Sequence, residues 1–291
     1  MNNVLVLILH YGSELDTCNC LQSIIGIEDI DIVVIDNDPK QIFEIKHIYK
    51  QKTCVFRTGG KSGFSESFNM AVRKKRNMHH EYIMILNNDM IVEKDALKEL
   101  LDTFKENNVG AVGPCMPYSN NRSVVWACGG SIDKILLRIY GLQPKITKKS
   151  YDVDYLPGAA ILTLFTVWDI VGGMPEKYFL AYEEAEFALR VKKLNVRVLV
   201  NPNSIIRHKV GMSSDTQPMY IYNGIRNRIK FGSFLYGKLV GTLLGIIVTL
   251  DQIKSFDYIV LWFRAVKDEM RGLSLSRDVL MEVKNQYSSF C

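Results

Sequence analysis

The chain has 291 residues, of which 47% are hydrophobic and 23% are charged, and its formal net charge is +5. This length allows one large α/β domain with an appendage, or two small domains, and the composition excludes disordered, repetitive and collagen-like chains. The charge is uneven, because residues 207–291 hold 12 basic and 7 acidic residues whereas residues 1–206 are balanced. A basic C-terminal region is typical of contact with anionic lipid, nucleic acid or a phosphorylated acceptor, or of a plain solvated surface.

Cysteine usage and the N-terminus both indicate the cytoplasm. The pair Cys18-Asn19-Cys20 is too tight for the usual zinc spacing, and no second Cys/His pair completes it. We therefore expect the cysteines to be reduced. The chain leads from Met1 directly into an apolar run, without the basic leader or small-residue cleavage site of a signal peptide.

Strands and helices alternate over the first 115 residues. Apolar runs predict strands at Val4–Leu9, Ile32–Ile35, Thr53–Phe56, Tyr82–Leu86 and Gly110–Cys115. Helical spacing predicts helices at 15–25, at 64–76 with Ser62 or Ser65 as the cap, and at Asp95–Phe104. This order predicts a mostly parallel sheet with helices on both faces, in which ligands bind beyond the carboxyl ends of the strands.

The remainder of the chain is less regular. We expect strands at Ala159–Phe165 and Val196–Val200 and a helix at Glu183–Leu194. Leu239–Leu250 is an uncharged and mostly apolar run of 12 residues, shorter than the roughly 20 that a membrane-spanning helix needs. With its basic flanks, it predicts helices that lie in or on a membrane interface. The alternative is a buried helical hairpin or a dimer contact.

Polar clusters follow two of the predicted strands. Asp36-Asn37-Asp38 could accept hydrogen bonds from a ribose or a base edge, although these are also ordinary turn residues. Leu86-Asn87-Asn88-Asp89 places oxygen ligands two residues apart at a strand end, where they can reach one hard cation such as Mg²⁺ or Mn²⁺. A turn is the alternative for this cluster as well.

The glycine-rich stretch Gly59–Gly63 fails as a P-loop, because Val55 stands where that motif needs its first glycine. The loop could still present backbone N–H groups and Lys61 to a diphosphate at a helix N-terminus. No G-x-G-x-x-G follows the first strand, which argues against a dinucleotide oxidoreductase.

An acidic cluster opens the helix predicted after residue 182. A carboxylate among Glu183, Glu184 and Glu186 could act as a general base. The alternative is structural, since the helix dipole favours acidic residues here and Glu186 can pair with Arg190 one turn later. His208 could be a metal ligand or a structural side chain. Arg226-Asn227-Arg228 could contact phosphates or lie on a polar helix face.

The order and spacing of these pieces resemble glycosyltransferase family 2, within its rhamnosyltransferase-like branch. The resemblance runs from about Val4 to Arg228. It rests on motifs that are weak singly and strong in series: VLILHYG at 6–12, VVIDND at 33–38, Gly63-Phe64 with Asn69, LNND at 86–89, YLPGAA at 155–160, GGMPE at 172–176, FLAYEEAEFALR at 179–190, and His208 followed by Arg226-Asn227.

The resemblance implies the GT-A fold, an α/β fold with a mixed central sheet, here with a C-terminal helical extension. It implies a glycosyltransferase domain at 1–230, with a nucleotide-binding half at about 1–115 and an acceptor half at about 116–230, followed by an amphipathic helical region at 231–291. Asp36 would hold the nucleoside, and Asp89 and His208 would bind a divalent metal, Mg or Mn. The other donor-side residues would be Tyr11, Lys61, Asn69, Asn87 and Asn88, and Gly158 and Glu176 would lie on the acceptor side.

The resemblance also implies the reaction. Glu184 aligns with the base of the family, which is usually an aspartate, and Glu183 and Glu186 are alternatives. The expected enzyme is an inverting, metal-dependent hexosyltransferase that uses a nucleotide-sugar donor, with dTDP-rhamnose and UDP-sugars as the candidates. Its acceptor would be a lipid-linked saccharide in O-antigen or capsule synthesis, at the inner face of the bacterial cytoplasmic membrane and without nucleic acid. The alternative is a non-catalytic nucleotide- or polysaccharide-binding member of the fold.

Overall fold

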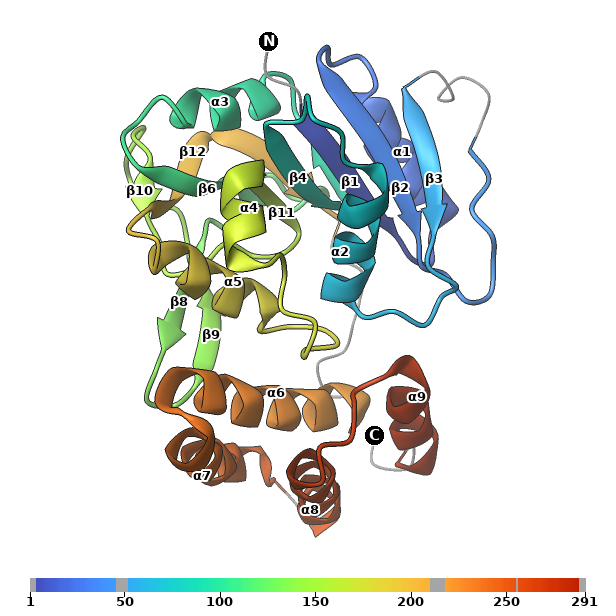
Figure 1. Cartoon of the computed structure of the whole chain (residues 1–291), viewed down its shortest axis with the longest axis vertical. Helices are drawn as coiled ribbons and strands as arrows, with labels where there is room; N and C mark the ends of the chain where they lie inside the picture. The colour runs from blue at the N-terminus through green and yellow to red at the C-terminus, as the bar shows by residue number, and fades with distance from the viewer. Residues whose placement is uncertain (1–3, 46–51, 210–217, 255, 288–291) are drawn as a thin grey trace.

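The computed structural model describes residues 4–45, 52–209, 218–254 and 256–287 of the chain. An α/β lobe holds a large central sheet, and a layer of helices from the C-terminal part of the chain lies against one end of that lobe (Figure 1). The largest part of the interest for function lies in a cavity where these two parts meet.

The central sheet is mixed, as expected. Its main strands follow the order β10-β12-β6-β11-β4-β1-β2-β3. The four strands from β3 to β4 are parallel, β11 is antiparallel to both of its neighbours, and β12 is parallel to β6. The strands of this path are β1 (Val4–His10), β2 (Ile30–Asp36), β3 (Thr53–Arg57), β4 (Tyr82–Asn87), β6 (Val109–Pro117), β10 (Tyr151–Asp152), β11 (Ala160–Leu164) and β12 (Arg197–His208).

Short strands extend this sheet at its edges. Strand β5 (Met90–Val92) pairs with β12, and β7 (Val125–Ala127) pairs with β6, whereas β8 (Gly130–Asp133) and β9 (Arg138–Gly141) form a separate hairpin. The helices are α1 (Glu14–Ile24), α2 (Phe64–Lys75), α3 (Ala96–Thr103), α4 (Phe165–Val171), α5 (Glu183–Lys192), α6 (Pro218–Tyr236), α7 (Lys238–Val248), α8 (Phe256–Met270) and α9 (Arg277–Gln286), with a 3₁₀ turn at Thr249–Gln252.

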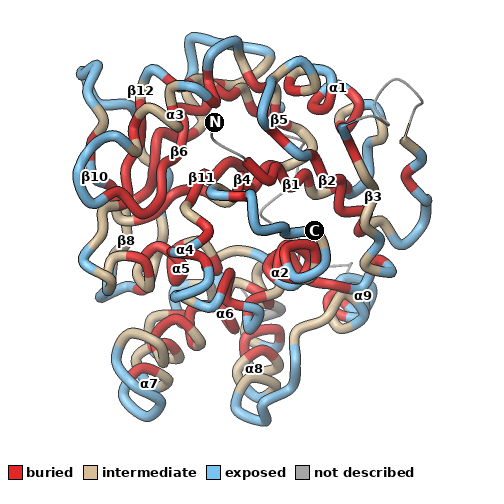
Figure 2. The backbone as a smooth tube through the Cα atoms, turned by 45° about the horizontal axis from the view of Figure 1, so that its top comes forward, coloured by how far each residue is buried: buried red, intermediate tan, exposed pale blue. Residues whose placement is uncertain are grey.

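The hydrophobic core has two layers, one on each face of the sheet. Along β1, Val4, Val6 and Ile8 pack in one cluster with residues of α1 and α3. Leu5 and Leu7 pack in the other cluster with residues of α2, α4 and α5. Because neighbouring side chains of a strand point to opposite faces, a continuous apolar run is what a strand covered on both faces requires. The burial of the central strands is visible in Figure 2.

The strands predicted from apolar runs in the first 115 residues are confirmed, with small differences at their ends. The strand predicted at Val196–Val200 is also present, but β12 continues beyond it to His208. The predicted cap of α2 is wrong, because Gly63 holds the N-cap position and makes no side-chain cap. Instead, the backbone N–H of Phe64 donates to the carbonyl of Phe179 over 2.9 Å. The hydroxyl of Ser62 contacts the sulfur of Met70 at 3.6 Å, and the buried hydroxyl of Ser65 has no hydrogen-bond partner. A tertiary partner therefore replaces the local cap.

The C-terminal helices form a third apolar cluster. Tyr222, Ile225 and Ile229 of α6 pack with residues of α8 and α9, among them Leu261, Ala265 and Val283. Helix α6 runs through residue 230 without a break. The division into a domain at 1–230 and a region at 231–291 stays a proposal, and this packing joins the two parts through α6.

Glycines allow α6 and α7 to touch backbone to backbone. A Cβ atom added to Gly241 of α7 would overlap the carbonyl of Gly232 of α6, and one added to Gly245 would come within 2.6 Å of the Cα of Ile229. We expect Gly241→Ala to lower the free energy of unfolding by about 1–3 kcal/mol, because the helices must move apart. Urea unfolding measures this change.

Gly224→Ala is the matched control on α6. A Cβ atom there would meet nothing within 4 Å. The replacement should leave stability unchanged or raise it by up to about 1 kcal/mol, because alanine favours a helix over glycine. Equal stability losses in the two variants would contradict the close crossing of α6 and α7.

None of the helices in the described ranges is both long enough and apolar enough to cross a bilayer. Within the same ranges the cysteines are free thiols, as predicted, and Cys18 and Cys20 are buried on α1. Cys291 lies outside the described residues.

Candidate functional site

A cavity of about 370 Å³ opens beyond the carboxyl ends of β1, β2 and β4. This is the edge at which parallel α/β sheets bind ligands. Its floor includes Tyr11 after β1, Asn37 after β2, and Asn87, Asn88 and Asp89 at the end of β4. The opposite wall comes from the loop before α5, from α6 and from α9. The cavity therefore lies between the α/β lobe and the C-terminal helices.

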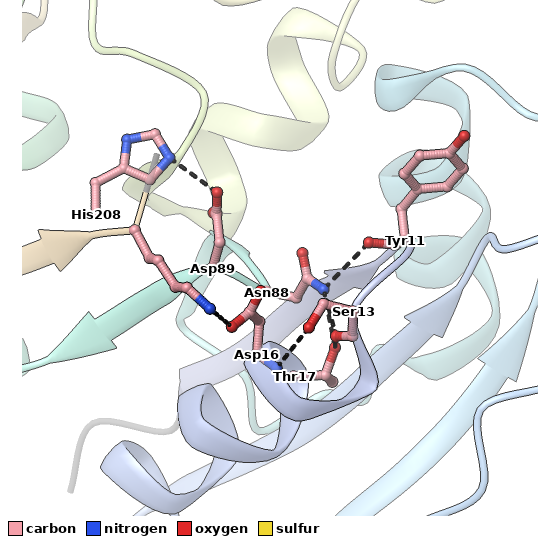
Figure 3. A network of polar contacts seen from close by, with 8 residues as sticks. Tyr11, Ser13, Asp16, Thr17, Asn88, Asp89 and His208 are labelled. Atoms are coloured by element: carbon pink, nitrogen blue, oxygen red, sulfur yellow. Dashed lines mark hydrogen bonds and ion pairs between the residues drawn. The ribbon is translucent and has the colours of Figure 1, made fainter. Parts of the chain in front are cut away.

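Asp89 and His208 face each other at this edge (Figure 3). Strand β5 follows Asp89 directly and pairs antiparallel with the end of β12, which sets His208 opposite Met90. The Nε2 atom of His208 lies 3.1 Å from Oδ2 of Asp89. The ring of Trp126 packs edge-on against the imidazole, with ring centroids 4.3 Å apart. The sheet pairing brings together two residues that are far apart in the sequence.

Asp89, His208 and the neighbouring Asn87 each have a buried polar atom without a hydrogen-bond partner. Oδ1 of Asn87, Oδ1 of Asp89 and Nδ1 of His208 are enclosed and make no hydrogen bond in the structure. An enclosed polar atom without a partner is costly, which points to a ligand that the chain itself does not supply. Within the described residues no group of three or more His, Cys, Asp or Glu side chains could hold a metal. Two carboxamide or carboxylate oxygens beside one imidazole fit a divalent ion that takes its other ligands from phosphate oxygens.

Asn88 fixes the loop after β1 rather than pointing into open space. Its amide Nδ2 donates to Oγ1 of Thr17 over 2.9 Å and lies 3.4 Å from the carbonyl oxygens of Tyr11 and Ser13. Thr17 in turn contacts Nδ1 of His10 at 2.6 Å. Figure 3 shows Asn88 directed towards this loop. These contacts position Tyr11 at the cavity.

The residues Asp36, Asn37 and Asp38, which follow β2, make different contacts. Asp36 is buried, and its carboxylate accepts hydrogen bonds from the backbone N–H groups of Phe43 at 3.0 Å and Asp38 at 3.3 Å. Asp38 accepts from the backbone N–H of Gly12 at 2.8 Å, which ties the loop after β2 to the loop after β1. Asn37 is the member of this cluster that lines the cavity, whereas the resemblance had implied a donor-side role for Asp36. A role for Asp36 in nucleoside binding stays a prediction.

The glycine-rich loop borders the same cavity through Ser62. Gly60 has a φ of +77°, and a Cβ atom there would come within 2.6 Å of the backbone of Pro39, so only glycine fits. Lys61 is largely exposed and lies 3.8 Å from Asp278 of α9. The predicted contact of Lys61 with a diphosphate stays a prediction.

The acidic cluster on α5 contains three carboxyl groups in different settings. Glu186 is fully buried, and it is paired with Arg190 at 2.6 Å, as the helical spacing predicted, and with Lys177 at 2.6 Å. The hydroxyl of Tyr178 also donates to Glu186 over 2.6 Å. Both carboxylate oxygens of Glu186 are therefore used in contacts within the protein, which is a structural role.

Burial and the neighbouring carboxyl of Glu184 raise the pKa of Glu183 well above its usual value. Burial raises the pKa of Glu184 to about 7. One carboxyl oxygen of Glu184 is enclosed without a partner. This pKa of Glu184 lies in the range that suits a general base.

Glu184 does not line the cavity, and other residues lie between it and the cavity. Gly158 lies between Glu184 and Phe64, because a Cβ atom at Gly158 would be 3.1 Å from the ring of Phe64 and 4.0 Å from Cβ of Glu184. Phe64 lines the cavity. The predicted acceptor-side Gly158 and the predicted base therefore meet at one wall of the candidate site.

The loop that carries this wall is held in an unusual conformation. Ala181 and Tyr182 have φ values of 68° and 75°, which non-glycine residues adopt rarely. The amide of Asn227 on α6 donates to the carbonyls of Leu180 and Ala181 at 2.8 and 2.9 Å, and Asn223 donates to Leu180 at 2.6 Å. Asn227 thus fixes the loop before α5, whereas the buried Arg226 pairs with Glu269 of α8 at 2.9 Å.

Asn69 and Glu176 lie together, away from the cavity lining. The amide of Asn69 donates to Glu176 and to the carbonyl of Met174, each over 2.8 Å. Arg73 also reaches Glu176 at 3.3 Å. These contacts join α2 to the loop after α4. The donor-side role of Asn69 and the acceptor-side role of Glu176 stay predictions.

The sequence of the chain matches a known protein family. A model described as Glycosyl transferase family 2 matches residues 5–161. The chain belongs to glycosyltransferase family 2. The hexosyltransferase Agl10 of low-salt glycan biosynthesis in Haloferax volcanii is 23% identical, over 82% of this chain and 78% of its own length. The dTDP-rhamnosyl transferase RfbF of Shigella flexneri is 22% identical, over 73% of this chain and 71% of its own.

Solved structures show the same fold for this family 2 glycosyltransferase. GalNAc-T7 with UDP, GalNAc and Mn²⁺ matches with a TM-score of 0.61 at 14% identity, covering 81% of this chain and 50% of its own. This chain therefore spans about half of that protein. The mannosyltransferase PcManGT of Pyrobaculum calidifontis, with GDP-Man and Mn²⁺, matches with a TM-score of 0.57 at 11% identity, over 99% of this chain and 80% of its own. The GT-A fold predicted from the motifs is confirmed.

Proposed function

We propose that this glycosyltransferase moves a sugar from a nucleoside diphosphate donor, dTDP-rhamnose or a UDP-sugar, to a saccharide acceptor of bacterial surface polysaccharide, O-antigen or capsule. One observation carries the proposal: a cavity at the carboxyl edge of the sheet contains Asn87 and Asp89 with unpartnered buried oxygens. The similarity to the dTDP-rhamnosyl transferase RfbF supports the choice of donor.

Asp89 and His208, with Asn87 beside them, are the residues that would hold a divalent metal, Mg or Mn. Solved GT-A neighbours that contain Mn²⁺ support this part of the proposal. A bound metal would neutralise charge on the diphosphate and make it a better leaving group.

Glu184 would take the proton from the acceptor hydroxyl. The hydroxyl oxygen would form a bond to the anomeric carbon of the donor sugar, from the face opposite the diphosphate. The bond from that carbon to the diphosphate oxygen would break, and the nucleoside diphosphate would leave with the bonding electrons. One displacement inverts the anomeric configuration and needs no covalent sugar–enzyme intermediate.

A screen of nucleotide sugars tests the function. The purified full chain is incubated with each donor, with and without Mn²⁺, and released nucleoside diphosphate is measured. We expect release from one donor class, dTDP- or UDP-linked, that depends on the divalent ion. If no donor is bound by calorimetry or turned over, the proposed function is wrong. Binding without turnover against any acceptor would favour the non-catalytic alternative.

We place the enzyme at the inner face of the cytoplasmic membrane, with a lipid-linked acceptor. The support is an apolar face on the C-terminal helices, with exposed fractions of 75% for Leu239, 55% for Leu243 and 61% for Ile247. Phe263 of α8 is exposed by 62%. In the sequence, lysines stand at 238, 254 and 267, near the ends of the segments that carry these side chains. Exposed apolar side chains beside cations favour the surface of an anionic bilayer.

Vesicle sedimentation tests the membrane contact. We expect the full chain to bind vesicles that contain phosphatidylglycerol more tightly than pure phosphatidylcholine vesicles, because of the basic flanks. Leu243→Asp combined with Ile247→Asp should abolish this binding. Ile135→Asp is the control, since Ile135 is 74% exposed but lies between β8 and β9. Unchanged binding of the double variant would refute the membrane contact.

A further inference from the structure

The last helix of the described chain forms part of the donor cavity. Arg277, Leu280 and Met281 of α9 line the same cavity as Asn87 and Asp89. Figure 1 shows α9 at the end of the helical layer, below the α/β lobe. More than 180 residues of chain separate Asp89 from Arg277, so only the tertiary fold places them at one site.

Arg277 is fixed by two contacts with the floor of the cavity. Its guanidinium carbon lies 4.7 Å from the centre of the Tyr11 ring. Its Nη1 atom donates to the backbone carbonyl of Asn37 over 3.3 Å, which is a long hydrogen bond. The cation–π contact orients the guanidinium without neutralising its charge.

The charge of Arg277 has no carboxylate partner among the described residues. Every other described arginine except Arg271 pairs with an aspartate or a glutamate. Arg271 is exposed to solvent, whereas Arg277 is half-buried in the cavity wall. A half-buried cation without a counter-ion is costly, and an anionic ligand in the cavity would supply the missing charge.

Helix α9 is anchored by contacts that do not involve Arg277. Leu280, Val283 and Tyr287 pack in the apolar cluster with α6 and α8. Arg264 of α8 pairs with Glu282 at 2.7 Å. The hydroxyl of Ser276 accepts a hydrogen bond from the backbone N–H of Val279 and caps the helix. Replacing Arg277 should therefore leave the helix in place.

We propose that Arg277 is a donor-binding residue whose guanidinium contacts the diphosphate of the nucleotide sugar. The proposal rests on the proposed function, because it assumes that the donor occupies this cavity. A guanidinium presents planar, paired N–H donors that match phosphate oxygens. The phosphates would then lie between Arg277 on the helical side and Asp89 on the sheet side. The C-terminal helices would thus complete the donor site of the α/β lobe.

Calorimetry on the full chain tests this assignment, with UDP, dTDP and their nucleosides uridine and thymidine as the probes. We expect Arg277→Ala to weaken diphosphate binding by at least about 10-fold, because a hydrogen bond to a charged group is lost. Nucleoside binding, measured by competition, should be unchanged. Arg277→Lys should restore part of the affinity, since it keeps the charge but loses the planar donors.

Lys284→Ala is the matched control, because it removes an exposed cation from the same helix. It should bind the diphosphates as the unchanged chain does. Arg277→Ala with unchanged or tighter diphosphate binding would overturn the proposal, and tighter binding would identify Arg277 as an obstruction. Equal losses for diphosphate and nucleoside would also overturn it. If the unchanged chain binds neither diphosphate, both this proposal and the proposed function fail.

Discussion

Glu184→Gln is expected to lower kcat by about 10²- to 10⁴-fold while donor binding stays within the error of the measurement. The amide keeps the size of the side chain and cannot accept the proton of the acceptor hydroxyl. The reason for choosing this residue is its setting, since burial raises its pKa to about 7 and one of its oxygens has no partner. Initial rates at saturating donor measure the effect.

The pH profile follows from the same pKa. A general base acts only when it is deprotonated, so kcat should rise with pH through about 7 and then level off. Glu184→Gln should remove this rise and leave a low rate that does not depend on pH in this range. A profile that falls between pH 6 and 8 would contradict the base assignment.

Glu183→Gln is the matched control for the base. Burial and the adjacent Glu184 raise the pKa of Glu183 well above its usual value, so this site favours the neutral form of the side chain, and an amide is neutral as well. We expect a much smaller change in kcat than for Glu184→Gln. If Glu183→Gln abolished transfer and Glu184→Gln did not, the base would be Glu183.

Asp89→Ala is expected to reduce kcat/KM by about 10²- to 10³-fold, the range found when a group that stabilises developing charge is removed. Asp89 faces His208 at 3.1 Å and has its other oxygen enclosed without a partner. Its loss should raise the concentration of Mn²⁺ that gives half-maximal activity. A titration of activity with Mn²⁺ measures both effects.

Asp102→Ala serves as the control for Asp89→Ala, because Asp102 is a surface carboxylate on α3 that pairs with Lys105 at 2.5 Å. It should keep full activity and the same Mn²⁺ dependence. Full activity of Asp89→Ala would refute the assigned role of Asp89. Far-UV circular dichroism of both variants separates a loss of activity from a loss of fold.

The fold could be predicted well because the first half of the chain follows simple periodicities. The continuous apolar run that forms β1 is what burial on both sheet faces requires, and the predicted strands up to β6 stand in the right order. The capping of α2 could not be predicted, since the N–H of Phe64 bonds to Phe179, more than 100 residues away. Patterns of neighbouring residues give no information about a hydrogen-bond partner so far away in the sequence.

The site was predicted in part. Asp89 and His208 come together as the resemblance implied, through the pairing of β5 with β12. Asn69 and Glu176 are hydrogen-bonded to each other, which the motifs did not indicate, and their roles in donor and acceptor binding stay predictions. Arg277 has no local signal at all: a single arginine at a helix start is ordinary, and only the packing of α9 brings it over Tyr11.

The position of the donor in the cavity can be determined by a crystal structure of the full chain with Mn²⁺ and the nucleoside diphosphate selected by the donor screen. We expect the diphosphate in the cavity beyond β1, β2 and β4, with its oxygens near Asp89 and Arg277, and with open space for an acceptor on the side of Glu184. A nucleotide bound elsewhere on the chain, with Asp89 and His208 touching neither metal nor phosphate, would contradict this expectation.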